Sequence, residues 1–449
     1  MADAPNPQAE RHPPGVAVLA GTEMAERFSY YGMTALLALY MTKQLLHPGH
    51  AENVVGLAGL RHFFEFRGAM SDRAFASLIY GWYGGLVYFT PMIGGWLADR
   101  WLGTKRTVVL GLILMMAGHL AMSFDATFLI ALLLLIAGSG CLKGNVAAQV
   151  GTLYPANEES RRSRGYAIFA TGINIGAVVG PLATGTISEI YSWHAGFALA
   201  AGLMLVALMV YLGGQRFLPD TRASNVPRTS LPPLTSEEKR RTWVLIGLIL
   251  LNIPVAVTYS MIWNIGILWI DQKVDLTSPL GQVPASWFNS LDSLGSIIAV
   301  VPLVALWAYQ ARRGTEPDGL AKIGMGSAII GGFALVLMAG CLLSGDAKVS
   351  VLWPIAAYLG MGLGFMWYWP TTLAVISQTA PAKLAATLVS GAYVSLFFGS
   401  VLMGWVGSFY ENMSNATFWA LDGAIALAGA ALIFAVRPAI RRALMSDPG

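Results

Sequence analysis

Long apolar runs constrain what this chain can fold into more than any other feature. About twelve such runs recur along its 449 residues, and some 20 apolar residues in a helix cross the hydrocarbon core of a bilayer. The runs lie at residues 16–43, 74–97, 105–123, 127–152, 165–190, 194–213, 242–269, 284–308, 320–343, 350–377, 384–409 and 416–436. Charged residues make up 12% of the chain, about half their share in soluble domains. The sequence therefore predicts an all-α membrane protein with 12 transmembrane helices.

One polar, Pro-rich stretch, residues 214–241, divides these runs into two sets of six. We interpret it as a cytoplasmic linker between six-helix bundles at 16–213 and 242–436. Residues 1–15 and 437–449 are expected to be cytoplasmic tails. Because the first fifteen residues lack the charged and apolar regions of a cleaved signal, the first membrane helix is expected to direct insertion.

Basic residues predict the orientation of the helices in the membrane. The loops on the side of the linker and of both tails hold most of the Lys and Arg residues. The opposite side has only Lys43, Arg61, Arg67, Arg73, Lys273 and Lys348. Cytoplasmic loops carry the excess of basic residues, so both termini are expected to be cytoplasmic. The expected location is the plasma membrane, as a multi-pass protein of a bacterial inner membrane.

Several function classes are excluded by composition and spacing. The sequence pI is about 9.0, but the basic residues form no recognition face, so no nucleic-acid partner is expected. Cys141 and Cys341 are the only cysteines and both lie in apolar runs, which excludes a disulfide framework and zinc-ligand spacing. With no metal-ligand set and no nucleophile–base pair, neither a metal, a cofactor nor an enzymatic activity is expected. His119, alone in its run, is interpreted as a satisfied packing residue.

The first apolar run carries charges that are costly inside a membrane. Glu23 and Arg27 are four residues apart, as are Glu26 and Tyr30, and Arg27 and Tyr31. In a helix, residues at this spacing lie on one face. One alternative is a cluster at the cytoplasmic surface whose side chains reach water. The apolar turn that precedes Glu23 favours a solute or proton pathway instead.

A second motif follows the second apolar run. It reads Gly94-Gly95-Trp-Leu-Ala-Asp99-Arg100 and continues to a basic segment. It resembles the helix 2–3 loop of the major facilitator superfamily, in which Gly95, Asp99 and Arg100 would form a conformational motif. Glycines allow helices to approach closely, and the acid can accept a basic partner or a helix terminus.

Three segments together are similar to the proton-dependent oligopeptide transporter family of that superfamily. They are EMAERFSYYG at 23–32, LVYFTPMIGGWLADR at 86–100, and GCLKGN at 140–145 followed by FATGINIG at 169–176. The resemblance implies two six-helix halves that rock around a central site by alternating access. It covers the N-terminal half well and the C-terminal half in outline.

The resemblance also implies roles for individual residues. Glu23, Glu26, Arg27 and Lys143 would be the proton-coupling cluster. Arg27, Lys143, Tyr30, Tyr31, Tyr88 and Asn174 would line the N-terminal side of a peptide pocket. For Lys143 the alternative is a buried ion pair with Glu23 or Glu26 that joins two helices. For Tyr88 and Asn174 the alternative is plain hydrogen bonding between helices.

Functional positions on the first run and in the C-terminal half depart from the family's pattern. Thr34 stands where members have an Arg. Ser260, in the run 242–269, stands where members have the Glu that pairs with that Arg, so the outer side is expected to close by apolar packing. Phe365 replaces the helix 10 Glu that receives the peptide's ammonium. Asp292 is the only carboxylate that the sequence indicates well inside this half. We expect it either to bind a substrate ammonium or to pair with a hydroxyl or a helix dipole.

The sequence therefore predicts a proton-coupled symporter that takes up di- and tripeptides. Its partners would be the peptide, protons and the lipid bilayer, and a monomer is expected. One alternative is a transporter of a modified peptide or amino-acid-like solute with altered coupling, since Phe365 lies in an aromatic stretch that can face a cation. Another is a sensor that binds substrate without transporting it.

Overall fold

The computed structural model describes residues 12–155, 158–219, 233–279, 281–381 and 383–445. These residues are almost entirely helical. In this part of the chain the extended pairing consists of one antiparallel pair, β1 (Thr277–Ser278) and β2 (Gly281–Gln282), and one isolated parallel bridge between Val274 and Val349. Parts of the predicted linker (220–232) and of the predicted tails (1–11 and 446–449) lie outside the described residues.

Within the described residues, nine helical stretches are long and apolar enough to cross a membrane. They are Thr104–Ala121, Asp125–Thr152, Glu159–Ile190, Trp193–Phe217, Ser236–Lys273, Ala285–Arg312, Gly319–Ser344, Thr387–Asn412 and Asn415–Leu444. Three further helices are long enough but less apolar: α1 (Pro14–Tyr40, 27 residues), α3 (Asp72–Leu97, 26 residues) and α13 (Leu352–Thr379, 28 residues). The all-α membrane fold is confirmed, and the count of twelve spans stays a prediction.

The chain forms two compact units. The first unit comprises residues 1–33 and 90–225, and the second comprises 34–89 and 226–449. Helices α1 and α3 each contribute to both units.

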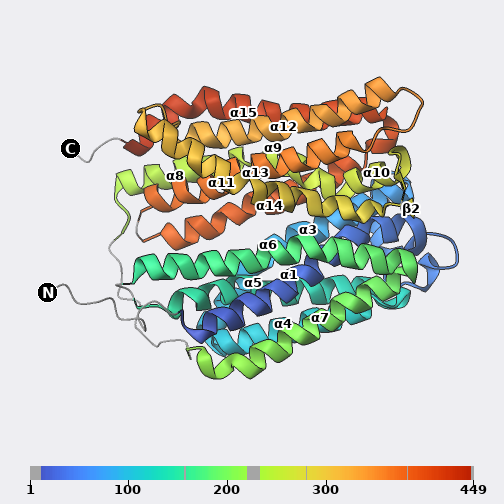
Figure 1. The fold of residues 1–449 in the computed structure, drawn as a ribbon, viewed down its shortest axis with the longest axis horizontal. Helices are drawn as coiled ribbons and strands as arrows, with labels where there is room; N and C mark the ends of the chain where they lie inside the picture. The colour runs from blue at the N-terminus through green and yellow to red at the C-terminus, as the bar shows by residue number, and fades with distance from the viewer. Residues whose placement is uncertain (1–11, 156–157, 220–232, 280, 382, 446–449) are drawn as a thin grey trace. The chain divides into compact units, whose positions relative to one another are not determined.

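The first unit contains the beginning of α1, the end of α3 and four further α-helices (Figure 1). These are α4 (Thr104–Ala121), α5 (Phe128–Thr152), α6 (Glu159–Ile190) and α7 (Trp193–Gly214), with the π-helical turn η4 (Ala98–Leu102) before α4. Helix α6 packs tightly on α1 through small residues. A Cβ on Gly176 would lie 2.5 Å from the Met24 carbonyl oxygen, and one on Gly180 would lie 2.5 Å from that of Phe28. Such small residues let membrane helices approach backbone to backbone.

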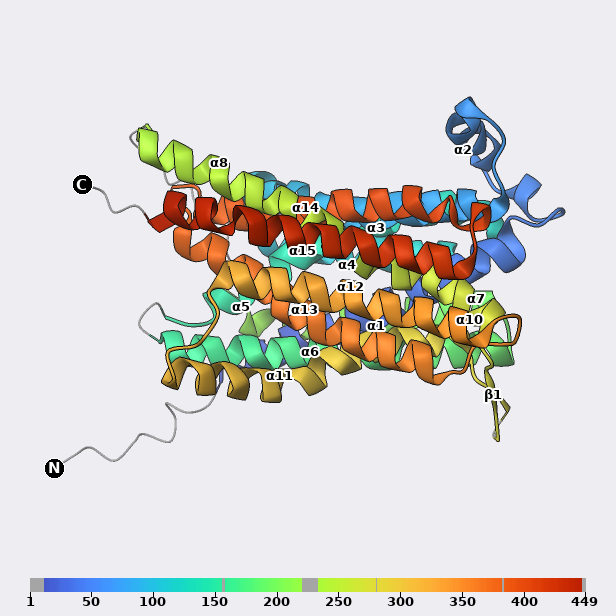
Figure 2. The same ribbon diagram turned by 90° about the horizontal axis from the view of Figure 1, so that it is seen from above.

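The second unit contains the end of α1, the beginning of α3 and most of the C-terminal part of the chain. After α1 come η1 (Met41–Leu45) and α2 (Leu57–Phe64). The C-terminal helices are α8 (Ser236–Leu251), α9 (Ile253–Met261), η7 (Ile262–Gly266), α10 (Ile267–Lys273), α11 (Asn289–Arg312), α12 (Gly319–Ser344), α13, α14 (Ala385–Gly407) and α15 (Asn415–Met445). Helix α12 packs against both α13 and α15, as Figure 2 shows.

Helix α8 begins six residues before the apolar run that predicts it. Thr235 accepts a hydrogen bond from the backbone N–H of Glu238, and the Glu238 carboxylate accepts one from the N–H of Thr235. This reciprocal capping box satisfies two backbone donors at a helix start. The helix therefore starts inside the polar segment 214–241.

The π-helical turn η7 interrupts the helix between α9 and α10. A π-helical turn adds one residue to the α-helical path and opens backbone carbonyls. The Tyr358 hydroxyl of α13 donates a hydrogen bond of 2.8 Å to the Ile262 carbonyl oxygen in this turn. That bond, from a fully buried side chain, anchors the turn to α13.

Candidate functional site

The charges of α1 form a buried cluster in the first unit. Nε of Arg27 lies 2.8 Å from Oε1 of Glu23 and 2.7 Å from Oε2 of Glu26. The side chains of Arg27, Glu23 and Glu26 are 9%, 3% and 0% exposed. The alternative of side chains that reach water is therefore wrong, because one guanidinium is held between two carboxylates inside the protein.

Lys143 of α5 joins this cluster through an aromatic ring. Its Nζ lies 4.0 Å from the centroid of the Tyr30 ring, and Cζ of Arg27 lies 5.7 Å from the same centroid. A ring face attracts cations, more strongly when water is excluded. Tyr31 packs edge-on to Tyr30, with centroids 5.3 Å apart. Lys143 also interacts electrostatically with Glu26, so both cations and both carboxylates belong to one electrostatic system.

The other predicted pocket residues fall in both units. Asn174 is half-buried on α6, between Gly172 and Gly176, which contact α1. Tyr88 is half-buried on α3 and belongs to the second unit. A pocket that combines them with Tyr30 and Tyr31 stays a prediction.

The predicted conformational motif spans the end of α3 and η4. Gly95 is half-buried, and Asp99 and Arg100 are exposed. The close approach is made by the preceding residue, because a Cβ on Gly94 would lie 2.0 Å from the Gly140 carbonyl oxygen of α5, whereas one on Gly95 would meet nothing within 4 Å. The motif thus packs α3 on α5 through Gly94, and the role of Gly95, Asp99 and Arg100 in conformational change stays a prediction.

Asp292 is the centre of a second cluster, in the second unit. Its side chain on α11 is buried, with the residue 1% exposed. The Tyr259 hydroxyl of α9 donates a hydrogen bond of 2.7 Å to Oδ2 of Asp292. The Tyr259 ring stacks on Phe365 of α13, with centroids 4.7 Å apart and planes inclined by 21°. Phe365, at the position where an acid is expected, therefore packs against the ring of Tyr259, and the hydroxyl of Tyr259 donates to Asp292.

A second buried carboxylate in this unit escaped the sequence reasoning. Asp422 of α15 is 0% exposed, so the prediction that Asp292 is the only internal carboxylate here is wrong. Neither carboxylate oxygen of Asp422 has a hydrogen-bond partner among the described residues. The Thr258 hydroxyl donates instead to its backbone carbonyl, at 2.7 Å. A single acid inside an apolar run is the signal that could have found it.

His119 also differs from its interpretation. It is fully buried on α4, but neither ring nitrogen has a hydrogen-bond partner within the described part of the chain. It is therefore a packing residue whose polar atoms are unsatisfied. In the same described residues, no group of three or more His, Cys, Asp or Glu side chains is arranged to hold a metal ion.

Comparison with known sequences finds relatives that match this chain over almost its whole length. The model of the Major Facilitator Superfamily matches residues 19–404. A protein of Bacillus subtilis (strain 168) described as "Uncharacterized transporter YclF" is 29% identical, over 96% of this chain and 95% of its own length. A di-/tripeptide transporter of Lactococcus lactis subsp. cremoris is 26% identical, over 97% of both chains.

Solved structures give a matching result. The crystal structure of the peptide transporter POT in complex with sulfate has a TM-score of 0.84 to this chain and 27% sequence identity, over 97% of both chains. The two folds therefore agree along nearly their full length.

Proposed function

Because the chain belongs to the Major Facilitator Superfamily and, within it, to the POT family, we propose that it takes up di- and tripeptides by proton-coupled symport. The di-/tripeptide transporter from Lactococcus, with 26% identity over nearly the full length, supports the substrate class. Uptake proceeds by alternating access of a site near the middle of the membrane. The protein acts as a monomer in a bacterial plasma membrane, and its basic residues predict that both termini are cytoplasmic.

The buried cluster of the first unit is the observation that carries the coupling mechanism. With Glu23 and Glu26 ionised, their two negative charges balance the positive charges of Arg27 and Lys143. Protonation of one carboxylate leaves a net positive charge, and a buried unbalanced charge is costly. The carboxylate of a peptide removes that charge when it binds. Proton and peptide therefore bind favourably together, which is the requirement for symport.

Glu26 is the proposed proton acceptor and Arg27 the proposed ligand of the peptide carboxylate. Glu26 is the more buried of the two carboxylates, so its protonation relieves the larger desolvation cost. Once Glu26 is neutral, its contact with Arg27 weakens, and the guanidinium gains freedom to bind a carboxylate in a bidentate manner. Lys143 maintains the charge balance while partners exchange.

The remaining groups recognise the body and the other end of the peptide. We assign Tyr30, Tyr31, Tyr88 and Asn174 to the peptide bond and the adjacent backbone, because phenols and amides both donate and accept hydrogen bonds. We assign the ammonium of the substrate to Asp292. Its carboxylate already accepts the Tyr259 hydroxyl and retains lone pairs for a cation.

A second candidate substrate is a modified peptide or an amino-acid-like solute. It is favoured by the Tyr259–Phe365 stack, which places aromatic faces where an acid is expected. Such a site accepts a cation without a second carboxylate. A substrate whose amino group is blocked would bind equally well under this alternative.

The test is transport of labelled dialanine in proteoliposomes, measured as exchange without a gradient and as uptake under an inward proton gradient. Accumulation above equilibrium is expected, and Glu26→Gln should abolish accumulation while leaving exchange. Glu316→Gln, which removes an acid on the exposed surface, is the matched control and should accumulate normally. Normal accumulation in both variants would refute the role of Glu26. Equal exchange of dialanine and its N-acetyl derivative would favour the second candidate.

A further inference from the structure

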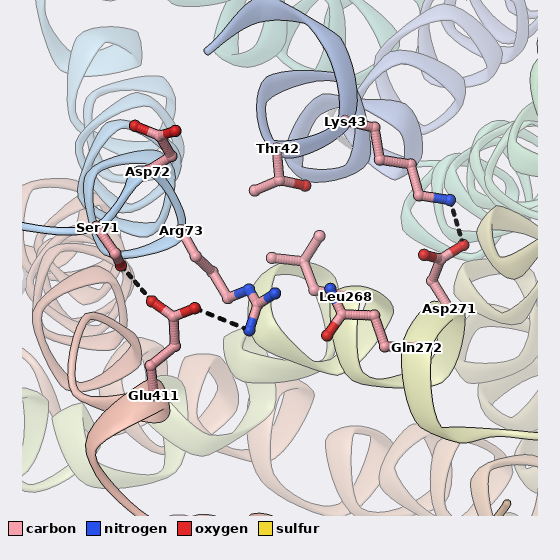
Figure 3. Close-up of a pocket in the computed structure, with 9 residues that line it drawn as sticks. All are labelled: Thr42, Lys43, Ser71, Asp72, Arg73, Leu268, Asp271, Gln272 and Glu411. Atoms are coloured by element: carbon pink, nitrogen blue, oxygen red, sulfur yellow. Dashed lines mark hydrogen bonds and ion pairs between the residues drawn. The ribbon is translucent and has the colours of Figure 1, made fainter. Parts of the chain in front are cut away.

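A charged pocket of about 270 Å³ lies at one end of the second unit. It is bordered by the ends of α1 and α10 and by the starts of α3 and of the loop after α14, as Figure 3 shows. Its lining contains five charged side chains: Lys43, Asp72, Arg73, Asp271 and Glu411. The basic-residue pattern predicts that this end faces the outside of the cell.

Two ion pairs cross this pocket. Nζ of Lys43, in η1 after α1, lies 2.6 Å from Oδ1 of Asp271 at the end of α10. Nη1 of Arg73, at the start of α3, lies 3.1 Å from Oε1 of Glu411 after α14. The Ser71 hydroxyl donates to the same Glu411 carboxylate. Each pair therefore ties a helix from the N-terminal part of the chain to a helix from the C-terminal part.

The third charged contact at the pocket is different in kind. Nη1 of Arg61 lies 2.7 Å from Oδ1 of Asp72, but these residues are only eleven positions apart in the chain. Their pair joins α2 to the start of α3 and crosses no helix–helix boundary between the two parts of the chain. Asp72 thus lines the same pocket without bridging it.

Close packing of α3 on α14 and η7 lies next to the ion pairs. A Cβ on Gly81 of α3 would lie 2.7 Å from Cα of Gly404 of α14. Nδ2 of Asn264 in η7 donates a hydrogen bond of 2.7 Å to the hydroxyl of Ser77 of α3. These contacts are possible only while α3 lies against α14 and η7, so any separation of the helices must also break the ion pairs.

We infer that Lys43–Asp271 and Arg73–Glu411 form a two-part ionic latch that closes the outer end of the transporter and opens once in each transport cycle. The inference rests on the proposed alternating access. Thr34 and Ser260, where the family carries a charged pair, hold no charge here. The Lys43–Asp271 pair lies at the ends of the two helical stretches that carry Thr34 and Ser260, and the latch is proposed in place of the closure by apolar packing that the sequence predicts.

The exposure of the pairs makes a latch physically reasonable. The four paired side chains are between 19% and 42% exposed, so water solvates each charge when a pair opens. Exposed pairs contribute at most about 1 kcal/mol each. That is enough to bias an equilibrium about fivefold per pair, without preventing opening.

The test measures access to Leu268, which lines the pocket but is only 2% exposed. Leu268→Cys is introduced into a chain without Cys141 and Cys341, and the purified protein is placed in nanodiscs, so that both faces are accessible. The rate of reaction with a charged maleimide is measured without substrate. Asp271→Asn and Glu411→Gln are each expected to raise the rate by up to about fivefold, and both together more than either alone.

Three comparisons decide the result. Asp72→Asn removes a charge from the same pocket and is expected to leave the rate unchanged. The exchanged pair Lys43→Asp with Asp271→Lys should return the rate to that of the parent. In the parent, added salt should raise the rate, because screening weakens exposed pairs.

Equal rates for Asp271→Asn, Glu411→Gln and Asp72→Asn would overturn the latch, as would a parent rate independent of salt. If a variant does not fold, the salt dependence of the parent still decides the question. The readout needs no transported solute. A protein that fails to transport peptides but shows the expected rates would contradict the proposed substrate and leave the latch standing.

Discussion

The two units bury acids in opposite ways. In the first unit, Glu23 and Glu26 lie beside Arg27, and Lys143 completes the charge balance. In the second unit, Asp292 has a phenol as its partner, and in the described residues neither it nor Asp422 forms an ion pair. A buried carboxylate without a cation is costly when ionised. The first unit is therefore built to hold charge by itself, whereas the second requires a cation from outside, either a proton or a substrate ammonium.

The largest effect is expected from removing the central cation. Arg27→Met leaves two carboxylates facing one ammonium in a buried site, which should lower the free energy of unfolding by about 3–5 kcal/mol and abolish transport. Thermal unfolding in detergent measures the first effect. Adding Glu23→Gln to Arg27→Met restores the charge balance and should recover most of the stability without transport. An unchanged melting temperature in Arg27→Met would remove the distinction between the units.

Asp292→Asn tests whether the second unit awaits a substrate cation. Loss of a charge-assisted hydrogen bond of about 1.5–3 kcal/mol should weaken binding of free dialanine by about 10- to 100-fold. Binding of N-acetyl-dialanine should not change. The amide oxygen of Asn can still accept from Tyr259, so stability should be preserved. Equal affinity of wild type and variant for free dialanine would exclude Asp292 as the ammonium site.

Tyr259→Phe sharpens the same comparison with a smaller change. It removes the hydroxyl that donates to Asp292 but retains the ring that stacks on Phe365. A buried hydrogen bond to a carboxylate contributes about 1.5–3 kcal/mol. In the variant, Asp292 recovers part of this free energy by taking up a proton, which makes it neutral. We expect an intermediate loss of dialanine affinity, measured by calorimetry. Phe365→Leu, which removes the stack and keeps the hydroxyl, is the matched variant and should have the weaker effect.

The smallest effect is expected at Asp422. If this unpartnered carboxylate carries a proton at rest, Asp422→Asn replaces one neutral group by another of similar shape, and stability should change by less than about 1 kcal/mol. Thermal unfolding of the variant measures this. A loss of several kcal/mol would mean that Asp422 is ionised against a cation, and the contrast between the units would then fail at this residue.

Features that depend on neighbouring residues could be predicted from the sequence. Apolar runs located the helices, and the four-residue spacing of Glu23 and Arg27 predicted their contact, because both are properties of one helix. The start of α8 was missed, because its capping box lies in a polar segment that carries no apolar signal. Asp422 was missed because one acid hardly alters the mean hydropathy of its run.

Contacts between distant segments could not be predicted in this way. Tyr259, Asp292 and Phe365 lie on three helices, and their stacking and hydrogen bond depend on how those helices pack. Lys43 and Asp271 are separated by 228 positions, and no local pattern relates them. The charge of each residue was readable from the sequence, but its partner was not.

The turn η7 determines how this chain aligns with any relative whose corresponding helix is regular. Its one extra residue shifts every position N-terminal to Ile262 by one, relative to a helix that is regular from end to end. An ungapped alignment anchored at Val274 and Asp275 matches the missing helix 7 acid to Ser260. Against a relative whose helix is regular throughout this stretch, the extra residue would make Tyr259 the equivalent position, and the hydroxyl of Tyr259 donates to Asp292. A chimera that replaces α9, η7 and α10 with a helix that is regular throughout must therefore be one residue shorter there to keep its N-terminal half in register.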